Sequence, residues 1–223
     1  MGGVAALLAA PALAQPEFAS LDGVGRVSVE AGWRLSANEL FYESFYALPD
    51  SQGLARAPSS PGGPFLAASF GYSITEYLEL GVDLFATGER LRLTNAPTLT
   101  NISYGALVAL RFQTLLDVLT PDGVVPFIGL GTGPTLAYSQ AEGLGKRELA
   151  TQTFAGSVGA TFRFSPQWAL TAEYRIAFAR GQSAYNNRDA FKSVLASYNA
   201  GGNWMALGVT YYMPPTDTRH PLP

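Results

Sequence analysis

Hydrophobic and polar residues alternate with a period of two along most of the chain. The clearest stretch runs from Thr153 to Phe178, where two alternating limbs flank the short turn Ser165–Gln167. Side chains on a β-strand point alternately to opposite faces, so each limb has one apolar face and one polar face. The stretch therefore predicts a β-hairpin, and each limb has about the ~9–11 residues that a tilted strand needs to cross a bilayer.

The same alternation recurs in eight segments. The predicted strands are 26–36, 65–74, 77–87, 101–113, 124–138, 153–164, 168–178 and 204–213. Their connections alternate between short and long, and the long irregular loops are expected at 37–64, 88–100, 139–150 and 179–203. An even number of antiparallel strands, with short turns at one end and long loops at the other, predicts an all-β, eight-stranded antiparallel up-and-down transmembrane β-barrel.

Charged residues make up only 14% of the chain, whereas soluble domains have roughly 25%. All the charges within the predicted strands fall on the polar face: Arg26, Glu30, Arg34, Glu79, Asp83, Arg111, Arg163, Glu173 and Arg175. A soluble barrel has the opposite polarity, with apolar residues inside. We therefore expect these nine residues to form a lumen charge network, and the apolar face to contact lipid.

Strand adjacency suggests the pairs within this network. We expect Glu173 to pair with Arg163 or Arg175, and Arg111 to pair with Glu79 or Asp83, because unpaired charges in a dry interior are costly. A structural network is the favoured interpretation of these carboxylates, and catalysis is the alternative.

Aromatic residues gather at the ends of the predicted strands. The short-turn end has Tyr72, Tyr77, Phe112, Phe164, Trp168 and Tyr211, and the long-loop end has Trp33, Tyr104, Tyr138, Phe154, Phe178 and Trp204. Two such girdles are typical of the two membrane–water interfaces.

The two ends of the chain are expected to lie outside the barrel. Residues 1–14 are apolar and end in small residues, which predicts a secretory signal peptide cleaved after Ala14. We expect residues 15–24 to form an N-terminal periplasmic segment, 25–213 the barrel, and 214–223 a periplasmic C-terminal tail. Both termini are then periplasmic.

An aromatic patch follows the first strand, at Phe41, Tyr42, Phe45 and Tyr46. In one interpretation it extends the strand beyond the membrane, with its rings packed on neighbouring loops. In the other it is an exposed contact surface on a loop.

The chain offers little for catalysis. It has no cysteine, and its one histidine, His220, lies in the tail, so a nucleophile with a histidine base has no place in the barrel. We expect no enzymatic activity, no catalytic or cofactor-binding residues, no cofactor and no metal. The net charge of −3 without a basic run also argues against nucleic acid as a partner.

Three motifs carry a resemblance to a known family: Pro126–Gly133, Trp168–Arg175 and Gly208–Met213. Through them the chain resembles the eight-stranded outer-membrane barrels of Gram-negative bacteria, the group that contains the transmembrane domain of outer-membrane protein A and the small proteins X and W. The resemblance implies the fold and the cell envelope as location. It leaves the activity open, because the group includes anchors, adhesion factors, small channels and lipid-modifying enzymes.

We therefore expect a non-enzymatic outer-membrane barrel with a structural or surface-interaction role carried by its extracellular loops. The alternative is a narrow channel for small hydrophobic solutes, which an apolar lumen would favour and nine inward charges disfavour. The expected partners are outer-membrane lipid and lipopolysaccharide, together with a surface or envelope protein that binds the loops. We expect the protein to be a monomer.

Overall fold

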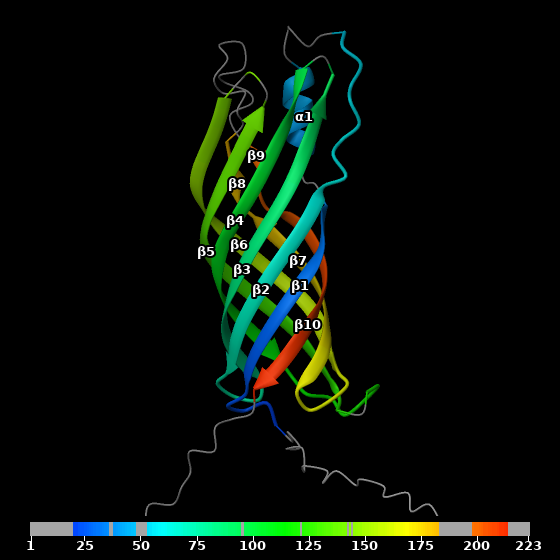
Figure 1. The fold of residues 1–223 in the computed structure, drawn as a ribbon, viewed down its shortest axis with the longest axis vertical. Helices are drawn as coiled ribbons and strands as arrows, with labels where there is room; N and C mark the ends of the chain where they lie inside the picture. The colour runs from blue at the N-terminus through cyan, green and yellow to red at the C-terminus, as the bar shows by residue number, and fades with distance from the viewer. Residues whose placement is uncertain are drawn as a thin grey trace, which may run out of the picture.

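The computed structural model describes residues 20–35, 38–47, 53–94, 96–120, 122–141, 143, 145–182 and 198–213. Within them, eight antiparallel strands close into a barrel (Figure 1). Around the barrel the strands are β1 (Gly25–Leu35), β10 (Gly202–Met213), β7 (Trp168–Phe178), β6 (Gly145–Arg163), β5 (Val124–Ala141), β4 (Ala96–Gln113), β3 (Leu78–Leu93) and β2 (Gly63–Ser73). The predicted fold class is confirmed. The expected signal peptide and C-terminal tail lie outside the described residues.

The first and last strands complete the barrel. β1 pairs with β10 from Gly25↔Met213 to Leu35↔Asn203. Along each strand, burial alternates with the same period as the sequence; in β2, for example, every second residue is buried. Because the exposed residues of that strand include Leu66 and Phe70, the apolar face points outward, as the sequence predicts for a barrel surrounded by lipid.

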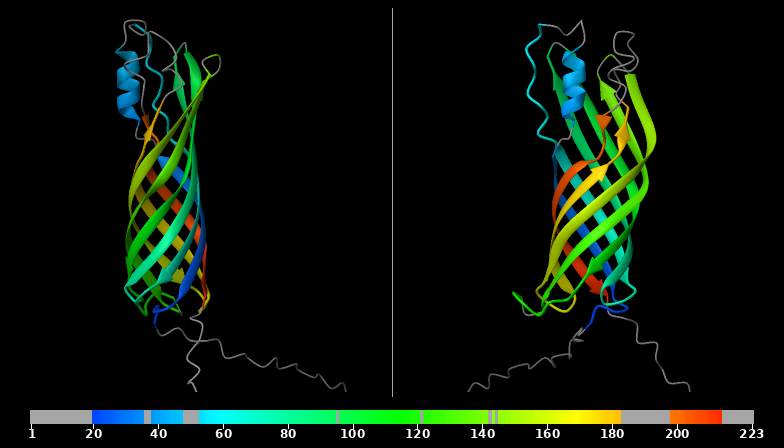
Figure 2. Two further views of the ribbon diagram at one scale, coloured as in Figure 1. Left: turned by 90° about the vertical axis from the view of Figure 1, so that its left-hand side faces the viewer. Right: turned by 180° about the vertical axis from the view of Figure 1, so that it is seen from behind.

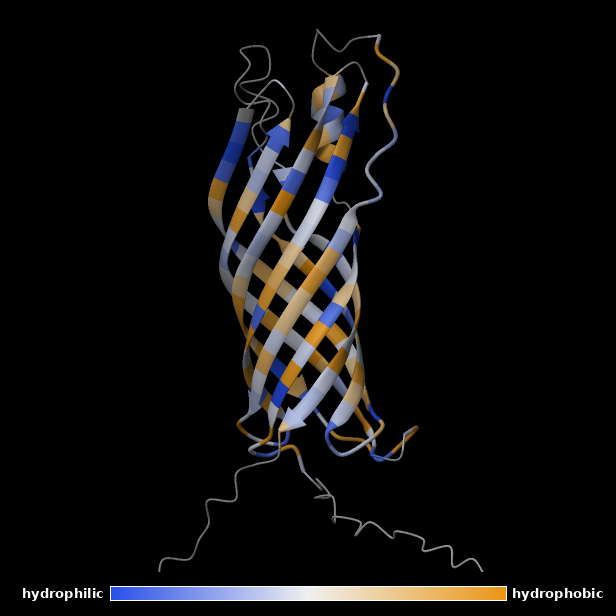
Figure 3. Cartoon of the chain, in the orientation of Figure 1, coloured by the Kyte–Doolittle hydropathy of each residue, from blue (hydrophilic) through white to orange (hydrophobic). Residues whose placement is uncertain are grey.

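Four strands continue above the rest of the barrel (Figure 2). The predicted long loops at 88–100 and 139–150 are wrong, because β3 and β4 are joined at residues 94–95, and β5 and β6 at residues 142–144. Figure 3 shows that the upper end of β6 is hydrophilic, and that hydrophilic and hydrophobic residues alternate at the upper end of β3. We call the part of β3, β4, β5 and β6 above Thr87 and Thr153 the extension.

A short helix, α1 (Glu39–Tyr46), and a two-stranded ladder of β8 (Arg180–Gly181) with β9 (Tyr198–Asn199) lie at this upper end (Figure 1). They cover the inner face of the extension and form one apolar cluster with it, which we call the cap: Phe41, Tyr42, Phe45, Leu91, Leu93, Leu99, Ala137, Ala141, Ala179, Tyr198 and Ala200. The described helix is too short to cross a membrane.

The structure corrects both interpretations of the aromatic patch in part. Its residues form the helix α1 rather than an extended strand, and the side chains of Phe41, Tyr42 and Phe45 are buried in the cap rather than exposed. Tyr46 is half-buried at its edge. Phe45 lies three residues after Tyr42 and four after Phe41, spacings that bring side chains to one face of a helix, and this face packs on the extension.

Candidate functional site: the filled lumen

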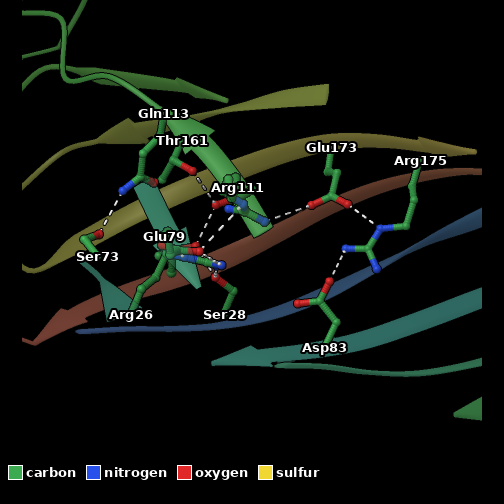
Figure 4. Close-up of polar contacts among 12 residues, drawn as sticks. Arg26, Ser28, Ser73, Glu79, Asp83, Arg111, Gln113, Thr161, Glu173 and Arg175 are labelled. Atoms are coloured by element: carbon green, nitrogen blue, oxygen red, sulfur yellow. Dashed lines mark hydrogen bonds and ion pairs between the residues drawn. The ribbon is translucent and has the colours of Figure 1, made fainter. Parts of the chain in front are cut away.

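The lower lumen contains a buried group of one acid and two arginines (Figure 4). Arg26 donates two hydrogen bonds to Glu79, with Nη2 2.7 Å from Oε1 and Nε 3.0 Å from Oε2. The Nε of Arg111 lies 3.7 Å from the same carboxylate. Charged pairs with two parallel hydrogen bonds are the strong ones, so β1 and β3 are tied together across the lumen here.

This group continues upward through Glu173. Its carboxylate accepts from Arg111 Nη2 at 3.3 Å and from Arg175 Nε at 2.6 Å, and Arg175 Nη2 reaches Asp83 at 2.8 Å (Figure 4). Three acids and three arginines thus form one continuous chain of opposite charges from β1 to β7 and back to β3. All six side chains are buried, and their formal charges cancel.

Each of the two pairing predictions left two partners open, and one partner of each is confirmed: Glu173 pairs with Arg175, and Arg111 lies beside Glu79. The register explains why the other two partners are not used. Glu173 lies opposite Gly159, whereas Arg163 lies opposite Ala169, four residues before Glu173 in β7. Arg163 instead donates to the carbonyl of Pro166 at 3.0 Å, at the short-turn end. Asp83 meets Arg175 rather than Arg111, because Arg111 is opposite Glu79 on the neighbouring strand.

The two other predicted network residues, Glu30 and Arg34, are buried at different heights. Glu30 lies opposite Gly208 and forms no ion pair with a residue that the structure describes. Arg34 lies higher and pairs with Glu89, with Nη1 2.8 Å from Oε2. The nine predicted residues are therefore all inward, but Glu30, Arg34 and Arg163 stand apart from the continuous chain.

Glu89 is the site residue that the sequence analysis missed, since it fell in a predicted loop. The same Glu89 oxygen accepts from Asn38 at 2.8 Å, and Arg34 also donates to the carbonyl of Asn199 at 2.8 Å and to that of Gly201. This upper pair joins the barrel wall to the residue before α1 and to β9.

Between the two charged layers lies an aromatic layer. Trp204 stacks on Phe65 with ring centroids 4.7 Å apart and contacts Phe85 at 4.9 Å. The guanidinium of Arg175 lies 5.8 Å from the Trp204 ring. The prediction that Trp204 belongs to the aromatic girdle at the long-loop end is wrong. Its side chain points into the lumen, like that of Ala206 two residues later, and is 1% exposed.

Little space is left around these side chains. The cavity beside Asp83, Arg111 and Arg175 has a volume of about 10 Å³, roughly the size of one water molecule. Above it, burial raises the pKa of Tyr42 in the cap to about 12, and burial also raises the pKa of Tyr198. The cap thus encloses both phenol groups.

The charged side chains of this site hold strands of the barrel together through ion pairs across the lumen. The acids of the site other than Glu30 are engaged by arginines, and the described part of the chain has no cluster of side chains suited to holding a metal ion. The one histidine, His220, lies outside the described residues.

Known proteins that share this fold include outer-membrane barrels. A model of the outer membrane protein β-barrel domain matches residues 4–212. No curated protein matches the sequence. Among solved structures, Neisserial surface protein A is similar with a TM-score of 0.53 and 17% identity over 85% of this chain and 99% of that one. OprG from Pseudomonas aeruginosa is similar with a TM-score of 0.51 and 12% identity over 86% of this chain and 96% of that one. These identities indicate a shared fold only.

Proposed function

Because the chain belongs to the outer membrane protein β-barrel family, we propose that it is a closed, non-enzymatic barrel whose specific role is carried by its extracellular end. The observation that carries this proposal is the filled lumen. From bottom to top it contains the charged chain through Glu173, the aromatic layer around Trp204, the Arg34–Glu89 pair and the cap. An eight-stranded barrel has an interior only just wide enough for side chains, and here they occupy it.

The proposed orientation places the extension and the cap outside the cell and both termini in the periplasm. Two observations support it. The short turns and the described ends of the chain lie at the same end of the barrel, as in outer-membrane barrels (Figure 1). At the other end the polarity of the wall reverses: Leu91 and Leu93 point inward, while Arg90 and Arg92 are exposed. A wall surrounded by water has this polarity, so the extension stands above the bilayer.

The filled lumen weighs against the alternative of a narrow channel for small hydrophobic solutes. Such a solute would have to pass two charged layers. Its apolar groups gain no favourable contact there, and separating buried ion pairs costs free energy. It would also have to displace Trp204, which packs against Phe65 and Phe85. The remaining candidate for function is the outer surface of the extension and the segments around it.

Conductance and protease access test this proposal together. Protein reconstituted in planar bilayers should give no steady ohmic steps under conditions in which a sixteen-stranded porin gives them. Protease added to whole cells should cut within residues 37–62 or 179–203, and a C-terminal epitope should become accessible only after the outer membrane is permeabilised. Stable ohmic steps would contradict the closed barrel. A C-terminal epitope that is accessible on intact cells would contradict the proposed orientation.

A further inference from the structure

The outer wall has a groove at the place where β2 stops pairing with β3. The ladder between these strands ends at Phe65↔Thr87, whereas β3 continues to Leu93 beside β4. Residues 58–62 run beside the edge of β3 that β2 has left. Between this segment and β3 lies a groove of about 630 Å³.

The lower part of this groove is apolar. It is lined by Trp33, Ile102 and the rings of Pro61 and Pro64. Trp33 and Ile102 are each nearly half exposed, and Trp33 Nε1 donates to the carbonyl of Pro61 at 2.9 Å, which fixes the segment against β1. Since Trp33 belongs to the upper aromatic girdle, the groove opens at the height of the membrane interface.

The upper part of the groove is basic. Arg90 and Arg92 line it and are exposed, and neither forms an ion pair with any residue in the described ranges. Both also line a neighbouring hollow of about 560 Å³, together with Thr98, Thr100 and Gln140. Two guanidinium groups beside hydroxyl and amide donors suit a phosphate, which binds arginine through paired hydrogen bonds.

We infer that this groove binds a phosphorylated lipid of the outer leaflet, with its phosphate on Arg90 and Arg92 and an acyl chain along Trp33 and Ile102. This inference rests on the proposed orientation, which puts the groove at the outer interface. A lipid fits better than free phosphate, because the basic and apolar parts are continuous and the apolar part opens at the membrane. Charge complementarity supports the same occupant, since Arg90 and Arg92 are exposed in the groove and pair with no acid among the described residues.

Tryptophan quenching reports on this groove directly. The chain has three tryptophans: Trp33 lines the groove, Trp204 is enclosed in the lumen, and Trp168 lies in the lower girdle. A Trp168→Phe protein therefore leaves Trp33 as its one lipid-facing reporter. In phosphatidylcholine vesicles, quenching by phosphatidic acid with a dibrominated acyl chain is compared with quenching by phosphatidylcholine that has the same chain.

The anionic lipid should be preferred at Trp33 by roughly fivefold for each arginine that it meets. Arg90→Gln with Arg92→Gln should bring this preference close to one. The matched control, Arg56→Gln with Arg180→Gln, removes two other exposed arginines of the upper end and should keep it. Equal quenching by the two lipids in the Trp168→Phe protein, or equal loss in the two double variants, would overturn the inference.

Inorganic phosphate separates the two sources of the anion. Added at millimolar concentration, it should leave the quenching by brominated phosphatidic acid unchanged; if it abolishes the preference, the site is one for free phosphate and the lipid assignment is wrong. Heat-modifiable gel mobility verifies that each variant is folded. If the Trp168→Phe protein shows no lipid preference and does not conduct, this inference alone is overturned. If it shows the preference and gives ohmic steps, only the closed barrel is overturned.

Discussion

Arg34 and Glu89 form an ion pair across the upper lumen, with Nη1 and Oε2 2.8 Å apart and both side chains buried. Arg34 is near the top of β1, and Glu89 lies just above the point where β3 loses its β2 partner. Because Asn38 and Asn199 bond to the same pair, it connects the barrel to the cap.

Glu89→Ala should destabilise the protein by about 3–5 kcal/mol, because it leaves a buried guanidinium without its carboxylate. Combining it with Arg34→Met should recover part of this loss. Urea unfolding in phospholipid vesicles, followed by tryptophan fluorescence, measures the free energy of unfolding. The control is Glu148→Ala, which removes an exposed carboxylate of β6 and should change stability by less than about 0.5 kcal/mol. Equal urea midpoints for Glu89→Ala and Glu148→Ala would show that the ion pair contributes nothing to stability.

Asp83 and Glu173 should show strong coupling, because both contact Arg175. After either single change to alanine, Arg175 keeps one carboxylate. The double variant removes both, so its loss of stability should exceed the sum of the single losses by at least about 0.5 kcal/mol. A double-mutant cycle on urea midpoints measures this term. Strict additivity would mean that the two acids do not share the arginine.

The sequence predicted the membrane-spanning part of the barrel well, for a physical reason. Within the bilayer the environment of each face is fixed, since lipid meets one and the packed lumen the other, and so period-two polarity identifies strands and facing together. The nine inward charges follow from that rule. The choice between the two partners left open for Glu173 and for Arg111 did not follow. Facing does not give the height at which a long arginine side chain finds its partner, as Arg163 shows.

In the extension the same rule fails. In Gly88–Leu93 the apolar residues point inward and the arginines outward, so a search for apolar outward faces interprets this stretch as a loop and misses Glu89. The cap was missed for a related reason. The aromatics of α1 pack at helical spacing onto a surface that exists only once the extension has formed.

Leu207→Arg should cost about 2–4 kcal/mol of folding stability, because this side chain projects from the middle of β10 on the lipid face, 71% exposed in the isolated protein. Leu119→Arg is the matched control. Leu119 is 85% exposed in the connection between β4 and β5, at the short-turn end, where an arginine reaches water. Urea unfolding in vesicles compares the two variants. Similar destabilisation by both would mean that Leu207 does not face lipid.

Phe45→Ala should loosen the cap while leaving the barrel folded. The Phe45 side chain is 2% exposed and packs within the cap, so its truncation removes roughly 3–5 kcal/mol of local packing. The ladders between the barrel strands do not involve α1, and local opening therefore costs less than global unfolding. Protease should then cut within residues 38–62 faster than in the parent, at unchanged heat-modifiable mobility. Leu40→Ala alters the opposite, 77% exposed face of α1 and should leave the cleavage rate unchanged. If both variants are cut at the parental rate, the cap does not hold α1 in place. The upper end must then be fixed by other contacts, such as the hydrogen bonds that Glu89 accepts from Arg34 and Asn38.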